Sequence, residues 1–299
     1  MNTKYNYKRG MLAMAACYLF WGFQPLYWAL DDGVDTTFLL ATRILWAAVV
    51  CLVILGIQGK LGQLAEAFRS REVRRREIPA SLLLLADWSI YLFAIRAGQI
   101  QQCSLGYYIM PLVMFALGAV IYRENVTWKH LAILALVVIG ICLSVQGFGG
   151  FPWVTAALAV CFAVYSAVKK SLSIDSIVST TMEILLMTPL ALLYILLFGR
   201  GAGGLADLTL VRQLFLIGGG LVTGLPMVFF SLGVRHLPLT MSGMCQYLSP
   251  TLGLICSRIL GESLTAEKLL SFAFVWLGVL LYLWMAFHEI RAEAKQNQS

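Results

Sequence analysis

The feature that most constrains this chain is a succession of long apolar runs covering almost its whole length. Runs of about 18 to 22 residues, as long as a helix needs to cross a hydrocarbon core, recur about ten times. A soluble core cannot bury a 299-residue chain that is 60% hydrophobic and 12% charged, so the runs predict membrane-spanning helices. We place these helices at 10–30, 37–57, 78–97, 103–121, 129–147, 153–169, 177–198, 213–233, 242–260 and 269–288.

One sequence block occurs twice. The block Leu-Gly-Tyr-Tyr-Ile-Met-Pro at 105–111 returns as Met-Cys-Gln-Tyr-Leu-Ser-Pro at 244–250, and the residues around it repeat at matching distances. The paired landmarks are Arg96 and Arg235, Tyr108 and Tyr247, Glu124 and Glu262, and Gly140 and Gly278. The pattern predicts an all-α polytopic membrane protein built from one five-helix unit used twice, in residues 1–148 and 149–299. Because five is odd, the two units should be inverted relative to each other.

The distribution of basic residues predicts the orientation in the membrane. If the amino terminus and the segment 58–77 are cytoplasmic, only Arg96, Arg200, Arg212, Arg258 and Lys268 fall on the opposite side. Cytoplasmic loops carry an excess of Lys and Arg, so both termini are expected in the cytoplasm. The basic run between residues 69 and 76 is thereby explained by topology, and no nucleic-acid partner is expected.

Three ionisable residues lie inside predicted helices. They are Arg43, Asp87 and Glu183, with Asp87 close to the middle of its helix. A charged side chain in hydrocarbon costs at least about 2.5 kcal/mol, so each must face protein, water or an opposite charge. Two interpretations follow: these residues line a solute path, or they form buried pairs that fix helix packing. Lys169 and Lys170 end their helix and are expected to extend to the cytoplasmic headgroups.

Aromatic and amide side chains accompany these charges. One central aqueous cavity would satisfy all of them at a lower cost than separate burial. We therefore predict a substrate-binding cavity lined by Trp21, Gln24, Arg43, Asp87, Trp88, Tyr91, Tyr108, Tyr165, Glu183, Gln246 and Tyr247. Positions where the helices are expected to bend are Pro25, Gly106, Pro111, Gly243 and Pro250.

Residue patterns for catalysis and metal binding are not found. The histidines His130, His236 and His288 are far apart in the sequence, and no second ligand follows at metal spacing. The seven cysteines lie in or beside apolar runs without a Cys-x-x-Cys pair, which is typical of packing residues. No metal, cofactor or enzymatic activity is therefore expected.

The paired five-helix units resemble the EamA fold of the drug/metabolite transporter superfamily, and within it the RarD subgroup. The resemblance extends along nearly the whole chain and is most specific at the Ser-Leu-Gly-Tyr sequence of 104–107. The other matching segments are 18–22 with Pro25, 43–46, 88–91, 108–112, Tyr165 with Lys169 and Lys170, 182–183, and 246–247 with 250–252. Four residues depart from the subgroup pattern: Asp87, Arg96 and Met110 replace Asn, and Gln102 replaces Glu.

The resemblance implies a ten-helix permease of the bacterial cytoplasmic membrane, usually an exporter of small metabolites or drugs. Its expected partners are a small-molecule solute and the lipid bilayer. Inverted repeats supply two conformations of similar energy, which suits alternating access. Proton coupling through Asp87 or Glu183 is one option, and uncoupled exchange is the other. The alternatives are a flippase for lipids or lipid-linked intermediates, a membrane-embedded enzyme, and a sensor. The oligomeric state is left open.

Overall fold

The computed structural model describes residues 6–30, 33–97, 99–144, 153–199, 204–205, 208–259, 270, 273–285 and 288. Within these ranges the secondary structure is helical and contains no strand. The first half contains α1 (Tyr7–Trp28), α2 (Thr36–Ile57), α3 (Leu61–Arg69), α4 (Arg71–Arg96), α5 (Ile100–Ile121) and α6 (Trp128–Ser144). The second half contains α7 (Trp153–Ser171), α8 (Ser176–Phe198), α9 (Leu210–His236), α10 (Leu239–Gln246), α11 (Leu248–Ile259) and a further apolar helix at Ala273–Met285.

The described helices confirm an all-helical chain with membrane-spanning character. By length and composition, α2, α7, α8 and α9 are long and apolar enough to cross a bilayer. Shorter apolar helices lie at Leu105–Ile121, Trp128–Cys142 and Ala273–Met285. The count of ten spans is therefore not confirmed in the part of the chain that the structure describes. The boundary expected between the two halves, at residues 148 and 149, lies outside the described residues.

The two copies of the repeated block differ in helix continuity. Helix α5 continues through Gly106 and Pro111, whereas the second copy is interrupted at Tyr247, between α10 and α11. The Tyr247 hydroxyl donates a hydrogen bond to the carbonyl oxygen of Tyr108 on α5, over 2.8 Å. A Cβ atom on Gly243 would lie 2.9 Å from the carbonyl oxygen of Pro111, so α10 and α5 cross with their backbones close together.

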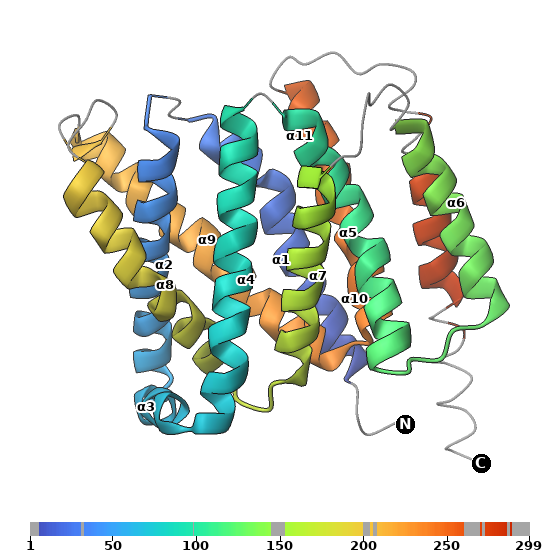
Figure 1. Ribbon diagram of the computed structural model, residues 1–299, viewed down its shortest axis with the longest axis horizontal. Helices are drawn as coiled ribbons and strands as arrows, with labels where there is room; N and C mark the ends of the chain where they lie inside the picture. The colour runs from blue at the N-terminus through green and yellow to red at the C-terminus, as the bar shows by residue number, and fades with distance from the viewer. Residues whose placement is uncertain are drawn as a thin grey trace.

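Helices of the two halves interlock. Helix α7 packs on α4 and α5, while α1 packs on α9 and α11, and α2 lies against α8 and α9 (Figure 1). Helix α6 lies at one edge of the bundle in Figure 1. The helix 273–285 packs beside it, since a Cβ on Gly278 would meet the side chain of Val137. The ring of Tyr282 is 5.5 Å from that of His130, at the start of α6.

One end of the bundle joins the two halves through charged side chains, and we call it the basic end. Lys60, just after α2, forms a 2.9 Å ion pair with Asp175, which caps the start of α8. Arg76, early in α4, donates to the carbonyl oxygen of Ser171 at the end of α7, over 2.6 Å. Burial alone would raise the pKa of Asp175, but hydrogen bonds from Lys60 and the backbone N–H of Ile177 hold that pKa below its ordinary value.

Glu124 connects further helix ends at the basic end. It follows α5, and its carboxylate accepts hydrogen bonds from the backbone N–H groups of Leu239 and Thr240, which begin α10, at 2.6 and 2.9 Å. A carboxylate at a helix amino terminus is stabilised by the unpaired N–H groups there. Lys170 lies 3.7 Å from the same carboxylate. At this end, therefore, α2, α5, α7 and α9 finish, while α1, α4, α8 and α10 begin.

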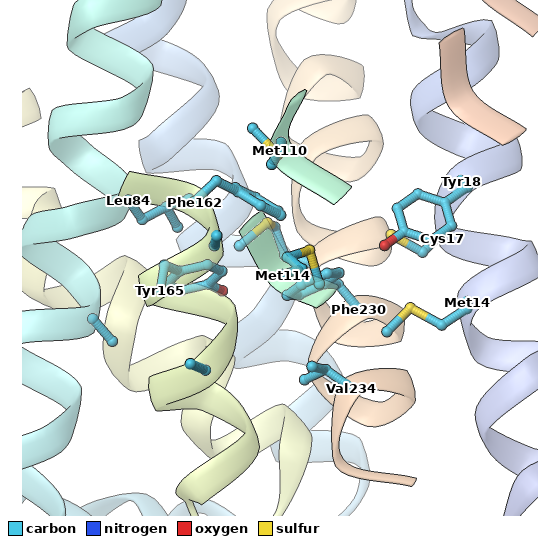
Figure 2. Packing of buried hydrophobic residues seen from close by; sticks show 14 of the residues in the cluster. Met14, Cys17, Tyr18, Leu84, Met110, Met114, Phe162, Tyr165, Phe230 and Val234 are labelled. Carbon is cyan, nitrogen blue, oxygen red and sulfur yellow. The ribbon is translucent and has the colours of Figure 1, made fainter. Parts of the chain in front are cut away.

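The core between the halves consists of thioether and aromatic side chains. Figure 2 shows Met14, Tyr18, Met110, Phe162 and Phe230 converging from α1, α5, α7 and α9. The ring centroid of Phe230 lies 5.2 Å from that of Phe162 and 5.9 Å from that of Tyr165, at distances typical of aromatic contacts. Methionine side chains fill irregular gaps between such rings and adapt to small movements, so this core can tolerate helix displacement.

Gly220→Ala is expected to destabilise the protein strongly. A Cβ at residue 220 would overlap Trp46 and lie 2.7 Å from the backbone nitrogen of Ala47, so α2 and α9 could not keep their separation. Overpacking of this kind costs roughly 1–3 kcal/mol of folding free energy. We expect a cost at the upper end of this range, because the added Cβ meets backbone atoms, which cannot easily move aside. Thermal melting of the purified protein in detergent measures the loss. Gly56→Ala is the control. Gly56 lies on α2, and no atom lies within 4 Å of the Cβ that the substitution adds, so the melting midpoint should stay unchanged or rise slightly.

Candidate functional site

The first candidate site gathers around Arg43 on α2, and we call Arg43, Asp87, Trp88, Tyr91 and Tyr107 the arginine cluster. Asp35 starts α2 by accepting hydrogen bonds from the backbone N–H groups of residues 37 and 38, at 3.0 and 2.9 Å. The cap fixes the helix two turns before Arg43. On α4, Asp87 and Tyr91 are four residues apart and share one face, which is turned toward α2 and α5.

Geometry within the arginine cluster leaves two charged groups incompletely paired. The guanidinium carbon of Arg43 lies 4.5 Å from the centroid of the Trp88 ring, a cation–π distance. Arg43 Nε and Asp87 Oδ1 are both buried and lack a hydrogen-bond partner. Asp87 is only 3% exposed, and Tyr91 packs edge-on against Tyr107 at 5.7 Å. The cluster therefore offers one donor, one acceptor and an aromatic surface to a further molecule.

The second candidate site lies closer to the basic end, and we call Glu77, Tyr165, Lys169, Ser179 and Glu183 the lysine cluster. Lys169 Nζ is 2.8 Å from Glu183 Oε2 and 3.7 Å from Glu77 Oε1. All three ionisable side chains are 0% exposed. Tyr165 donates to Glu183 Oε1 over 3.0 Å, Lys169 donates to Ser179 Oγ over 2.5 Å, and the Ser179 hydroxyl donates to Glu77 Oε1.

Helical spacing explains how the lysine cluster forms. Tyr165 and Lys169 are four residues apart on α7, and Ser179 and Glu183 are four apart on α8, so each pair lies on one helix face. The short connection between α7 and α8 brings these two faces together. Glu77 approaches from α4, the neighbour of both helices. Three helices thus enclose two carboxylates and one ammonium group.

Comparisons with known proteins agree with this architecture. The model of the EamA-like transporter family matches residues 8–146 and again residues 151–284. The chain belongs to the EamA-like transporter family. An uncharacterized transporter of Pseudomonas aeruginosa is 32% identical over 289 residues, covering 96% of this chain and 97% of that protein. Protein RarD of Escherichia coli is 26% identical over 290 residues, covering 96% and 98%. The resemblance to RarD-type proteins is confirmed, and the protein is a multi-pass membrane transporter.

A solved crystal structure shares the fold. It has a TM-score of 0.76 and 17% sequence identity with this transporter, and the match covers 95% of this chain and 99% of the other. At that identity the similarity concerns the arrangement of the helices alone. The roles of individual residues in this transporter therefore depend on its own geometry.

The expectation that Lys169 and Lys170 extend to the cytoplasmic headgroups is wrong. The Lys169 side chain is fully buried between two carboxylates, and the Lys170 side chain is 4% exposed and donates to the carbonyl oxygens of Val234 and Leu237. Glu77, at the end of the segment 58–77, lies inside α4, which begins at Arg71, and is 0% exposed. These residues stand at the edges of apolar runs, where a sequence does not indicate how far neighbouring helices extend. The spacing of Tyr165 and Lys169, together with an intramembrane Glu183, is the signal that could have indicated this pairing.

The other predicted site residues are divided among several contacts. Trp21 packs in the aromatic core, 5.8 Å from Phe162 and 5.7 Å from Phe230. The Gln246 amide nitrogen lies 2.7 Å from the Met110 sulfur, and its Oε1 is buried without a partner. Tyr108 and Tyr247 are joined by the hydrogen bond between α5 and the α10–α11 break, and Gln24 is half-buried. Asp87 and Glu77 are ten residues apart on α4, or ~15 Å along its axis, so the ionisable residues form two separate clusters.

Among the four residues that depart from the RarD pattern, Asp87 is the one with a buried oxygen lacking a partner. The Gln102 side chain accepts from the backbone N–H of Val154 over 3.3 Å, and Met110 contacts Gln246. Gln102 and Met110 therefore join α5 to α7 and α10. The side chain of Arg96 lies outside the described residues.

Proposed function

We propose that this protein is a secondary transporter, working as an exporter, for a small organic solute that carries both a positive and a negative charge. Amino acids, related metabolites and amphipathic drugs fit this description. The observation that carries the proposal is the pair of buried atoms without a hydrogen-bond partner, Arg43 Nε and Asp87 Oδ1, with the Trp88 ring against the Arg43 guanidinium. The solute carboxylate would bind Arg43, its ammonium group would bind Asp87, and its apolar part would lie on the aromatic rings.

Energetics favour this interpretation over a purely structural role for the two charges. A buried polar group without a hydrogen bond costs about 1–3 kcal/mol, and a charged group costs more. Arg43 and Asp87 interact electrostatically, but this leaves Arg43 Nε and Asp87 Oδ1 without a hydrogen bond. A zwitterionic solute supplies the missing partner to each group at once. Solute binding would therefore recover free energy that the solute-free protein does not use.

The helix directions support alternating access. At the basic end α1, α4 and α10 begin and their counterparts in the other half, α7, α9 and α5, end, so the halves run in opposite senses. Inverted repeats of this kind give two conformations related by exchanging the roles of the halves. Lys60–Asp175 and Arg76–Ser171 close the basic end between the halves. Opening toward that side would require these contacts to break while equivalent contacts form at the other end.

The basic end is proposed to face the cytoplasm of a bacterial cell, with both termini on that side. Its exposed Arg71, Arg74 and Arg75 follow the charge rule for cytoplasmic segments. A reporter enzyme fused after Ser299 should be active only if it functions in the cytoplasm. Activity of a periplasmic reporter at the same position would overturn this orientation.

A counterflow screen in proteoliposomes tests the proposed function. Vesicles preloaded with one unlabelled compound are mixed with its labelled form, and amino acids, small metabolites and amphipathic drugs are tried in turn. We expect transient accumulation of zwitterionic compounds and none of simple anions. Accumulation limited to lipids with long acyl chains would overturn the proposal. Coupling to protons through Asp87 or Glu183 is then tested by imposing a pH gradient on the same vesicles.

A further inference from the structure

We infer that the lysine cluster is a binding site for a single proton, held on Glu77 in the structure described here. The inference deepens the proposed transport function, because it assigns the coupling proton to a residue of α4 distinct from the solute-binding Arg43 and Asp87. It rests on the charge balance and the hydrogen bonds of the cluster. Its test requires neither a known solute nor transport activity.

Charge balance gives the number of protons. Glu77, Lys169 and Glu183 are all 0% exposed, and two carboxylates face a single ammonium group. With every group ionised the cluster would carry one net negative charge in a site without water contact. An uncompensated buried charge costs several kcal/mol, and such groups take up a proton instead. One proton on either carboxylate makes the cluster neutral.

Hydrogen bonds indicate which carboxylate holds the proton. Glu183 accepts from the Tyr165 hydroxyl at Oε1, and its Oε2 lies 2.8 Å from the ammonium group of Lys169, as an ionised carboxylate would. Glu77 is farther from Lys169, with its Oε1 at 3.7 Å. Neither Glu77 Oε2 nor Glu183 Oε2 accepts a hydrogen bond, but Glu183 Oε2 keeps its 2.8 Å ion contact, whereas Lys169 approaches Glu77 at Oε1. An oxygen with neither a donor nor a cation beside it is the less stabilised place for negative charge. The proton is therefore assigned to Oε2 of Glu77.

Other titratable groups near the cluster do not alter this balance. Cys51 of α2 lies near Glu183 and Lys169, and Cys17 of α1 lies near Tyr165, whose hydroxyl donates to Glu183. Arg235 of α9 also interacts electrostatically with Glu77. Its guanidinium donates to the carbonyl oxygen of Ile174 and to Ser176, and it is partly exposed to water. The nearest positive charge to both carboxylates remains Lys169.

Release of the proton from Glu77 would change how the Lys169 ammonium group is shared between Glu77 in the first half and Glu183 in the second half. An ionised Glu77 competes with Glu183 for the ammonium group, and Ser179 bridges the two positions by accepting from Lys169 and donating to Glu77. Attraction to Glu77 joins α7 of the second half to α4 of the first half more tightly. Protonation weakens the same contact. The proton thereby controls a link between the halves close to the basic end, where the transporter must open to the proposed cytoplasmic side.

Infrared difference spectroscopy of the purified protein counts the buried protons directly. The C=O stretching band of a protonated carboxyl group is compared between wild type and variants at neutral pH. Glu77→Gln should remove one carboxyl from this band, and so should Glu183→Gln, because the remaining carboxylate then pairs with Lys169. Lys169→Met should increase the band by one carboxyl. Glu72→Gln, an exposed carboxylate at the start of the same α4, is the control and should leave the band unchanged.

Hydrogen-bond variants locate the proton. Ser179→Ala removes the donor to Glu77 and should shift the band to higher frequency, whereas Tyr165→Phe should leave its frequency unchanged. A shift in Tyr165→Phe alone would place the proton on Glu183 and overturn the assignment. Spectra of Glu77→Gln and Glu183→Gln identical to wild type would overturn the whole inference. If the spectra behave as expected and no solute is exchanged, the proposed transport function fails while the proton site stands.

Discussion

Lys169→Ala is expected to reduce the stability of the protein strongly. The substitution leaves Glu77 and Glu183 facing each other without the ammonium group that lies 3.7 and 2.8 Å from them. Removing one partner of a buried ion pair costs about 3–5 kcal/mol. For a chain of this size such a loss corresponds to a fall in the thermal midpoint on the order of 10 °C. Melting of the protein in detergent, followed by circular dichroism, measures it.

A neutral replacement distinguishes lost charge pairing from lost packing. The triple variant Lys169→Met, Glu77→Gln, Glu183→Gln keeps the volume of the lysine cluster but removes its charges. It should recover most of the stability, because buried ion pairs contribute little beyond well-packed neutral groups. Lys129→Ala, at an exposed position near the start of α6, serves as the control for loss of a lysine. A midpoint for Lys169→Ala equal to that of Lys129→Ala would contradict the burial of Lys169.

Arg43→Ala is expected to abolish transport while the protein still inserts and folds. The guanidinium is the only cation in the arginine cluster, and its Nε has no hydrogen-bond partner to lose. A charged hydrogen bond to a solute carboxylate is worth about 1.5–3 kcal/mol, and its loss leaves the carboxylate buried and unpaired. The combined effect should lower the initial rate of counterflow at least about 100-fold. Initial rates are measured with the zwitterionic compound that the screen identifies.

Two variants accompany this measurement. Arg258→Ala, at an exposed position in the last turn of α11, controls for the loss of an arginine and should transport at the wild-type rate. Arg43→Lys keeps the positive charge but not the planar donor group, so its rate should be intermediate. Size-exclusion profiles and melting midpoints close to wild type would show that Arg43→Ala is folded. Normal counterflow by the folded Arg43→Ala protein would identify Arg43 as a packing residue and contradict the proposed site.

Much of the architecture could be predicted from the sequence. Apolar runs long enough to span a bilayer are expected to form helices, because a helix hydrogen-bonds its backbone N–H and C=O groups within the segment and lipid offers them no partner. The repeated Tyr and Pro of the two blocks indicated two related halves, and the family model matches once in each. Arg43, Asp87 and Glu183 were recognisable because ionisable residues inside apolar runs are rare and costly. These inferences need only local information.

Tertiary structure alone decided which charges meet. In the structure Arg43 and Asp87 interact electrostatically, but Arg43 Nε and Asp87 Oδ1 have no hydrogen bond, and Trp88 lies against the guanidinium. It also places the break of the second repeat at Tyr247, whereas α5 stays continuous at the equivalent position. Partner choice depends on helix rotation and separation. These are set by side-chain packing over whole helix faces, such as the contact of Gly220 with Trp46.

The lysine cluster shows both what the sequence predicts and what depends on tertiary structure. Composition and periodicity determined that α4 and α7 exist, and they placed Glu77 and Lys169 at the edges of apolar runs. An edge position is exposed or buried according to how far the neighbouring helices extend past it. Here α4 begins at Arg71 and α7 continues to Ser171, and α8 covers Lys169 with Ser179 and Glu183. Burial is a property of the assembled bundle, so two residues that the sequence places at solvated helix ends are fully buried in the structure.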